Sequence, residues 1–258
     1  MYANYHTHTV RCGHATGSER EYIENAIKAG IKILGFSDHA PMPFDDDYVS
    51  GIRMPCSLAG EYISTIRALA EEYKSDIKIY AGYEAEYYPR IFDRFIELIS
   101  KTDCDYLIMG QHFNKYEEGG RYNGAATDKE KDICSYVDEV IEGLSTGKFS
   151  YLAHPDLINY NGDSEIYKRE MRKICIYAKE NKIPLEINLW GLLYKRQYPN
   201  PLFWDIVAEV GADAVLGYDA HVPNLFENTE LLCEAQEIAE KRNIHLVDEV
   251  KLINPCKV

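Results

Sequence analysis

The chain has a shortage of basic residues and no long hydrophobic run. Its 28 Lys and Arg are outnumbered by 42 Asp and Glu, so the formal net charge is −14 over 258 residues. Because phosphate backbones bind basic surfaces, this balance argues against a nucleic-acid partner. No apolar stretch approaches the roughly 18 residues that span a bilayer, and the N-terminus shows no basic-then-apolar signal. We therefore predict a cytoplasmic protein with no membrane contact.

Cysteines are present, but no two of them form a CxxC pair. The seven residues are odd in number and widely scattered along the chain. This pattern is typical of free thiols in a reducing compartment, and it disfavours a disulfide framework or a zinc knuckle. With 46% hydrophobic residues the chain has ample material for a buried core. We predict one domain over residues 1–258.

Short apolar runs alternate with polar helical stretches along the whole chain. After a short N-terminal run, they begin at Ile31, Ile77, Asp105, Phe149, Ile183 and Ala212. Helical segments lie between them, such as "GSEREYIENAIKAG", where Ser18 and Glu21 have capping-box spacing and Gly30 is placed to end the helix. Seven strands alternating with helices predict a parallel sheet with helices outside it. The polar, Gly-containing stretch 115–130 predicts a loop that overhangs a site.

Three histidines lie within nine residues in the N-terminal stretch "NYHTHTVRCGHA". In a strand His6 and His8 would point the same way, near enough to share a metal ion, and His14 follows closely. An affinity tag would be an unbroken run of histidines, which this stretch is not. The stretch is therefore a candidate metal site.

Histidine or carboxylate side chains accompany six of the seven predicted strands. In chain order they are His6 and His8, Asp38 and His39, Glu84 and Glu86, His112, His154 and Asp156, and Asp219 and His221. In a (β/α) barrel the carboxyl ends of the strands face one mouth, so these residues would converge there. Imidazole and carboxylate are ligands for Zn²⁺, Mn²⁺ or Fe, and their number predicts two or three ions rather than one.

Individual members of this set have other possible roles. Asp38 and Asp156 could orient the adjacent histidines instead of binding metal themselves. Strand spacing alone does not separate Glu84 from Glu86 as the ligand. His245, the one histidine away from the strand ends, is expected to be structural.

The motifs "HTHT", "GHA", "SDHAP", "GYEAEY", "GQH", "AHPD" and "GYDAH" together resemble the polymerase and histidinol phosphatase (PHP) superfamily. Within it, "GFSDHAPMPF" and "EINLWGLLYKRQYPNP" are most similar to histidinol-phosphatases. The resemblance covers nearly the whole chain. It implies a distorted (β/α)7 TIM-like barrel with a trinuclear site, and hydrolysis of L-histidinol phosphate by metal-bound hydroxide in histidine biosynthesis.

The resemblance also implies how the ions are held, with Glu84 preferred over Glu86. The first ion would take His6, His8, Glu84 and Asp219; the second would share Glu84 and add His112 and His154; the third would take His14, His39 and His221. Asp219 or His221 would be the catalytic acid for the leaving group. The identity of the three divalent ions, among Zn, Mn and Fe, stays open.

The chain departs from the family pattern around the expected substrate phosphate. Leu193 stands where members often carry Arg, and "LINYNGD" replaces a segment that often supplies another. Lys195 or Arg196 is the candidate phosphate anchor, because an arginine can bind phosphate through two hydrogen bonds. Tyr198 is a candidate pocket residue, whereas core packing is expected for Trp190.

Several alternatives remain at this point. A different small phosphate ester, or nucleic-acid ends as for an exonuclease, would use the same metal site; acidity disfavours the second. An amidohydrolase or deaminase would need a carbamylated Lys or Glu from the fourth strand, where this chain has "LIMGQH". A non-catalytic metal store or sensor would need a partner surface, and the sequence shows no basic patch or appended module.

Overall fold

The computed structural model describes residues 1–45 and 47–257. The parallel strands are β1 (Ala3–Asn4), β2 (Ile33–His39), β3 (Lys78–Ala85), β4 (Tyr106–Met109), β7 (Leu185–Asn188) and β8 (Ala214–Gly217). Regular pairing runs in the order β1-β2-β3-β4 and separately between β7 and β8. Each of these strands overlaps one of the predicted apolar runs, and β2 and β3 extend beyond the end of theirs, to His39 and Ala85.

Isolated parallel bridges close these two sheets into a ring. Leu152 pairs with Met109 of β4 on one side and with Leu185 of β7 on the other, and Thr7 pairs with Ala220 just after β8. The seven parallel segments therefore form a closed but irregular barrel, as predicted from the sequence.

The fifth predicted strand, the run from Phe149, is reduced to the single bridging residue Leu152. Its backbone N–H donates to Pro184 O and its carbonyl accepts from Glu186 N. Pro184 has no N–H with which to extend this ladder toward Ser150. The prediction of a regular strand here was wrong, although the segment occupies the predicted place in the ring.

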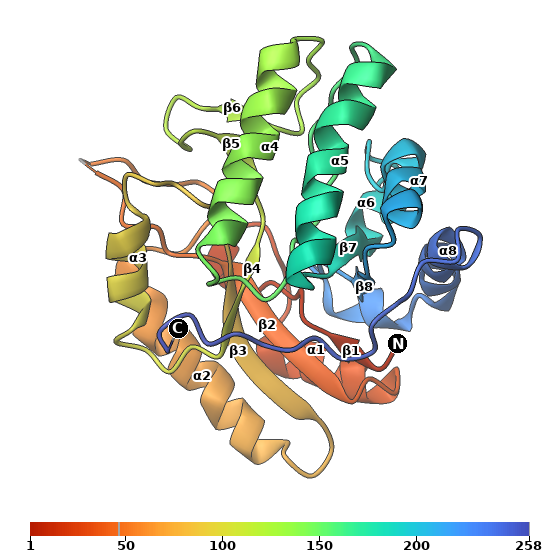
Figure 1. The fold of residues 1–258 in the computed structure, drawn as a ribbon. Coiled ribbons are helices and arrows are strands. Elements are labelled where there is room, and N and C mark those ends of the chain that lie inside the picture. The colour runs from red at the N-terminus through yellow and green to blue at the C-terminus, as the bar shows by residue number, and fades with distance from the viewer. Residues whose placement is uncertain (46, 258) are drawn as a thin grey trace.

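Helices surround the ring (Figure 1). They are α1 (Glu19–Lys28), α2 (Ala59–Glu72), α3 (Phe92–Ile99), α4 (Glu130–Ser145), α5 (Ser164–Asn181), α6 (Leu189–Leu193), α7 (Pro201–Val210) and α8 (Thr229–Glu240), with 3-10 turns at Val10–Cys12, Cys56–Leu58 and Pro223–Glu227. In Figure 1, α4 and α5 stand side by side, and they pack against each other. None of the described helices is long and apolar enough to cross a membrane.

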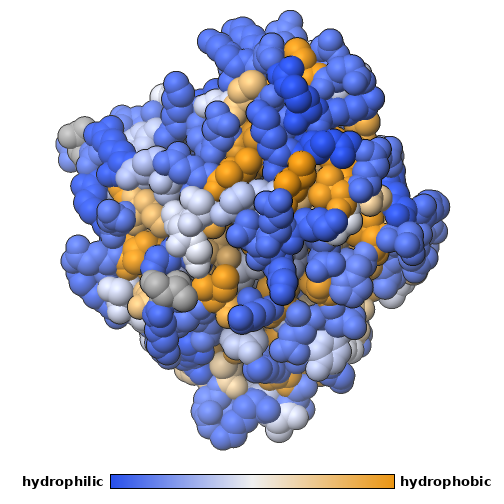
Figure 2. Space-filling view, in the orientation of Figure 1, coloured by the Kyte–Doolittle hydropathy of each residue, from blue (hydrophilic) through white to orange (hydrophobic). Residues whose placement is uncertain are grey.

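Two hydrophobic layers hold the barrel together. The larger lies between the strands and the helices, and the smaller fills the barrel with side chains that include Tyr5, Tyr106 and Tyr151. The Tyr106 hydroxyl donates to Tyr5 O at 2.7 Å, so a ring fills space while its polar end is satisfied. The outer face in Figure 2 is mostly hydrophilic, with only scattered hydrophobic side chains.

The stretch 115–130 is not wholly a loop as expected. Strand β6 (Arg121–Tyr122) pairs antiparallel with β5 (Phe113–Asn114), and Glu130 already begins α4. Gly119 adopts φ +71° in the turn between the two strands, a conformation that glycine tolerates without steric cost. The single-sequence pattern hid this hairpin because each of its strands is only two residues long.

The capping box predicted for the first helix is present and offers a test of local stability. The Ser18 N–H donates to Glu21 Oε2 at 2.6 Å, and Glu21 N donates to Ser18 Oγ at 3.3 Å. We expect Ser18→Ala to lower the free energy of unfolding by about 1 kcal/mol, because the N-cap acceptor is lost. Urea denaturation would measure it, with exposed Ser64→Ala on α2 as the control. Equal stability of the two variants would contradict this expectation.

Candidate metal centre and active site

The nine side chains predicted as metal ligands come together at the carboxyl ends of the parallel segments. Their imidazoles form a chain of near neighbours, with ring centroids 5.2 Å apart for His6 and His8, 4.5 Å for His8 and His39, 5.1 Å for His39 and His112, 4.9 Å for His112 and His154, and 4.9 Å for His14 and His221. His245 lies apart and exposed, paired with Asp213. The arrangement follows from strand direction, because parallel strands end at the same rim.

The Glu84 carboxylate lies at the centre of these imidazoles. Its Oε1 is 2.8 Å from His154 Nε2 and 3.4 Å from His112 Nε2, and its Oε2 is 3.0 Å from His39 Nδ1 and 3.5 Å from both His6 Nε2 and His8 Nε2. Glu84 is 1% exposed, so water does not solvate its charge. A carboxylate with nitrogens on both oxygens has the geometry to bridge two cations.

Several buried nitrogen and oxygen atoms of this cluster have no hydrogen-bond partner in the described part of the chain and could instead bind cations. His6 Nε2, His8 Nε2, His39 Nδ1 and Glu84 Oε2 have no hydrogen-bond partner among the described residues. Buried polar atoms without partners are costly, and bound metal would satisfy them. Five groups of described residues have ligand atoms within 4.8 Å of one another: His6 with Glu84 and His154, His6 with His8 and Asp219, His8 with His39 and Glu84, His14 with His39 and His221, and His8 with Cys12 and His221.

The charges in the cluster also favour cations. Burial raises the pKa of Asp219, but the neighbouring His6 and His8 outweigh it and hold the pKa well below its usual range. Burial and the charge of His8 lower the pKa of His221 to about 3. Neither group holds a proton near neutral pH, which favours metal coordination over proton donation. The acid role of Asp219 or His221 stays a prediction.

Glu86 faces away from the centre and contacts the far nitrogen of one imidazole. Its Oε1 is 2.9 Å from His112 Nδ1, while His112 Nε2 faces Glu84. The two glutamates that sequence spacing could not separate thus have different places: Glu84 lies among the imidazoles and Glu86 lies behind one of them.

Asp38 and Asp156 were each a candidate to orient the neighbouring histidine. The Asp38 carboxylate instead contacts the ring of His8. Its Oδ1 is 3.4 Å from His8 Nδ1, and it contacts His39 only through the backbone N–H at 2.8 Å. Asp156 accepts the backbone N–H of Asn200. Burial raises the pKa of Asp156 to about 7.

Glu186 is a buried carboxylate at this rim that the sequence reading missed. It belongs to β7, and its oxygens lie 2.8 Å from His6 Nδ1 and 3.0 Å from the N–H of His154, which has φ +29°. Glu186 therefore orients one imidazole and stabilises a strained turn beneath another. A lone charge inside the apolar run "IPLEINL" was the available signal.

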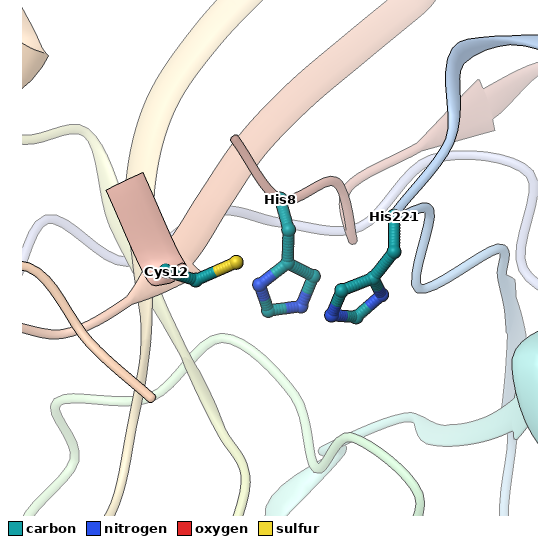
Figure 3. A group of neighbouring side chains, drawn as sticks. All are labelled: His8, Cys12 and His221. Carbon is teal, nitrogen blue, oxygen red and sulfur yellow. The ribbon is translucent and has the colours of Figure 1, made fainter. Parts of the chain in front are cut away.

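Cys12 is a second residue that strand-end reasoning left out. The described cysteines are all free thiols, as predicted, and Cys12 is 1% exposed. Its sulfur points toward the His8 ring, with His221 stacked beyond it at a centroid distance of 4.0 Å (Figure 3). Cys12 is the last residue of the 3-10 turn Val10–Cys12 and is not in a strand, so strand periodicity could not place it.

A cavity of about 450 Å³ opens above the cluster, and residues from several loops form its walls. These are Ile52, Phe113, Tyr122, Trp190, Arg196 and Tyr198. Trp190, expected in the core, is half-buried and lies 4.6 Å from the His221 ring centroid. Both predicted phosphate anchors are exposed, but Arg196 lines the cavity, whereas Lys195 lies outside its lining as far as the structure describes it.

Two glycines leave the space that the central carboxylates occupy. A Cβ on Gly110 would lie 2.0 Å from Glu84 Oε1, and a Cβ on Gly217 would lie 1.8 Å from Glu186 Oε1. Both glycines come directly after or at the end of a strand, β4 and β8. Close approach of carboxylate to backbone therefore requires glycine at these positions.

Comparison with known proteins identifies close relatives of this chain. The family model described as PHP domain matches residues 4–189. The chain is 32% identical over 250 residues to the histidinol-phosphatase of Bacillus subtilis, covering 84% of this chain and 92% of that one. It is 31% identical over 228 residues to a probable histidinol-phosphatase of Deinococcus radiodurans, covering 84% and 85%.

A solved structure has the same fold. Histidinol phosphate phosphatase from Lactococcus lactis, complexed with Zn, L-histidinol and phosphate, superposes with a TM-score of 0.74 at 19% identity, covering 97% of this chain and 98% of that one. The likeness confirms the predicted distorted TIM-like barrel.

Gly110→Ala tests whether the space beside Glu84 matters for metal binding. We expect the folded variant to bind Zn²⁺ at least about 10-fold more weakly, because the new methyl group displaces Glu84. Chelator competition on protein of verified fold would measure it. Gly60→Ala on α2, where a Cβ meets nothing within 4 Å, is the matched control. Unchanged Zn²⁺ affinity in Gly110→Ala would contradict the placement of Glu84.

Proposed function

Because the chain belongs to the PHP domain family, we propose that it hydrolyses L-histidinol phosphate to L-histidinol and phosphate. It is a metal-dependent phosphoric monoester hydrolase of the histidinol-phosphatase type. The observation that carries the substrate proposal is the placing of an aromatic-walled cavity with one arginine directly above the histidine and carboxylate cluster. We also propose that residues 1–258 act as one phosphoesterase domain.

Three divalent ions are proposed for the cluster, held as the family pattern implies. The first would take His6, His8, Glu84 and Asp219; the second Glu84, His112 and His154; the third His14, His39 and His221. The partnerless buried atoms of the cluster support this assignment. When bound, such ions lower the pKa of water and neutralise charge that develops on a phosphoryl group. All the ligands are N or O donors, which suits Zn, Mn and Fe alike.

The remaining side chains bind and orient the substrate in this proposal. Arg196 lies beside Tyr122, whose pKa is raised by burial and partly lowered again by the Arg196 charge. A guanidinium at the cavity wall can donate two hydrogen bonds to phosphate oxygens. Trp190 and Tyr198 offer flat faces to an imidazole ring, and they exclude water from the ester bond.

A second candidate is a different small phosphate monoester, acted on at the same cluster. Leu193, which stands where relatives of this type often carry arginine, favours it, because this side chain is exposed and cannot bind phosphate. In both readings the metal cluster is shared, and only the residues of the cavity wall decide the substrate.

Phosphate release from L-histidinol phosphate and from a panel of small monoesters tests the proposal. With added Mn²⁺ or Zn²⁺ and measured metal content, we expect a preference for L-histidinol phosphate. His6→Ala and Glu84→Ala should each reduce turnover by at least about 100-fold, since each removes a proposed ligand. Metal-dependent turnover of other esters alone would favour the second candidate. Bound metal without turnover of any ester would contradict a catalytic role.

Arg196 and Lys195 provide a matched pair for the phosphate anchor. We expect Arg196→Met to raise KM for L-histidinol phosphate about 10-fold or more, because a charge-assisted pair of hydrogen bonds is lost. Lys195→Met should behave like the unchanged protein, since Lys195 is not among the described residues that line the cavity. Steady-state kinetics would measure both. The reverse ranking would transfer the anchor role to Lys195.

A further inference from the structure

An arginine outside the metal cluster is buried against two carboxylates. Arg53 lies on the segment between β2 and α2, and its side chain is 1% exposed. Its Nε and Nη2 donate to Glu117 Oε2 at 2.8 and 2.6 Å, and Nη1 donates to Ala40 O at 3.1 Å. The same Nη2 lies 2.8 Å from Glu86 Oε2 as an ion pair. One guanidinium thus spans both glutamates.

Glu86 links Arg53 to the candidate metal centre, because it contacts both Arg53 and His112. It is fully buried, with one oxygen facing Arg53 and the other 2.9 Å from His112 Nδ1. A carboxylate against Nδ1 holds the proton on that nitrogen, so the lone pair is on Nε2. His112 Nε2 faces the centre, 3.4 Å from Glu84 Oε1.

The charges explain why an arginine is needed at this position. Glu86 and Glu117 are both buried, and a buried carboxylate without a cation either takes up a proton or turns toward water. The planar guanidinium can reach two carboxylates and a carbonyl at once, whereas an ammonium group is a single point charge. Glu117 has a second partner in the Tyr48 hydroxyl at 3.1 Å, but Glu86 has only Arg53 and His112 among the described side chains that contact it.

We propose that Arg53 is a positioning residue for the metal centre. The ion pair with Arg53 holds Glu86 in place, and Glu86 in turn orients His112 through Nδ1 so that Nε2 is offered to an ion. Arg53 is not among the described residues that line the cavity above the cluster. The inference rests on the proposed function only in taking His112 as a ligand, and it concerns the proposed second ion, shared by Glu84, His112 and His154.

The first readout is the protonation of His112 in the metal-free protein. Proton–nitrogen correlation spectra of protein with labelled histidine report which ring nitrogen carries the proton, and His112→Gln identifies the resonance. At a pH where the His112 ring is neutral, we expect only the Nδ1–H tautomer in the unchanged protein and a mixture in Arg53→Met. Arg53→Lys should lie between them. Glu117→Gln should keep the tautomer, because Arg53 still holds Glu86.

The second readout is metal affinity, measured by Zn²⁺ titration against a chelator. Arg53→Met should lower the affinity for one of the Zn²⁺ ions about 10- to 100-fold and leave the affinity for the others unchanged. The double variant with Glu86→Gln should lose no more than Glu86→Gln alone, because Arg53 acts through Glu86. Arg67→Met is the control for losing a paired arginine, since Arg67 binds Asp103 and Asp105 away from the cluster.

Three results would overturn the inference: an unchanged His112 tautomer in folded Arg53→Met, an equal loss of affinity in Arg67→Met, or additive losses in the double variant. The proposed function fails in a different way. Unchanged protein that binds Zn²⁺ but hydrolyses no phosphate ester would contradict that function, while the tautomer of His112 would still decide the role of Arg53.

Discussion

The burial of the Glu84 carboxylate among imidazoles is the constraint on which the rest of the site depends. A charge that is 1% exposed must be neutralised from inside the protein. Five histidine nitrogens lie within 3.5 Å of its two oxygens. The backbone yields space at Gly110, where any side chain would collide with this carboxylate. The cluster is thus organised around the negative charge of Glu84, which bound cations would neutralise better than the surrounding histidine protons do.

A second layer of carboxylates surrounds these imidazoles and explains the many buried acids. Glu186, Asp38 and Glu86 contact His6, His8 and His112 on the nitrogens that face away from Glu84. Each such contact fixes a ring orientation and a tautomer, which is how a metal ligand is usually prepared. Part of the excess of acidic over basic residues therefore lies buried around these imidazoles. Bound cations would offset this part of the negative charge.

The elements that form the cavity walls differ from those that carry most of the cluster. Strand ends supply the histidines, whereas the cavity walls come from loops and short elements such as the β5–β6 hairpin and α6. Connecting segments of this kind tolerate sequence change better than the strands that they join. In the proposed function, Arg196 and the aromatic side chains of these walls select the phosphate ester, whereas the histidine and carboxylate cluster would hold the metal.

The sequence by itself predicted the alternation of strands and helices and the strand ends that carry the histidines, because strand periodicity is a local property. The phosphatase chemistry was predicted from the resemblance of its motifs to the PHP superfamily. Only the tertiary structure decided the separate places of Glu84 and Glu86, since their spacing is the same in any strand. It also decided the roles of Glu186, Cys12 and Arg53, which contact residues distant in sequence. The single-residue bridge at Leu152 and the β5–β6 hairpin likewise depend on neighbours that no local pattern reveals.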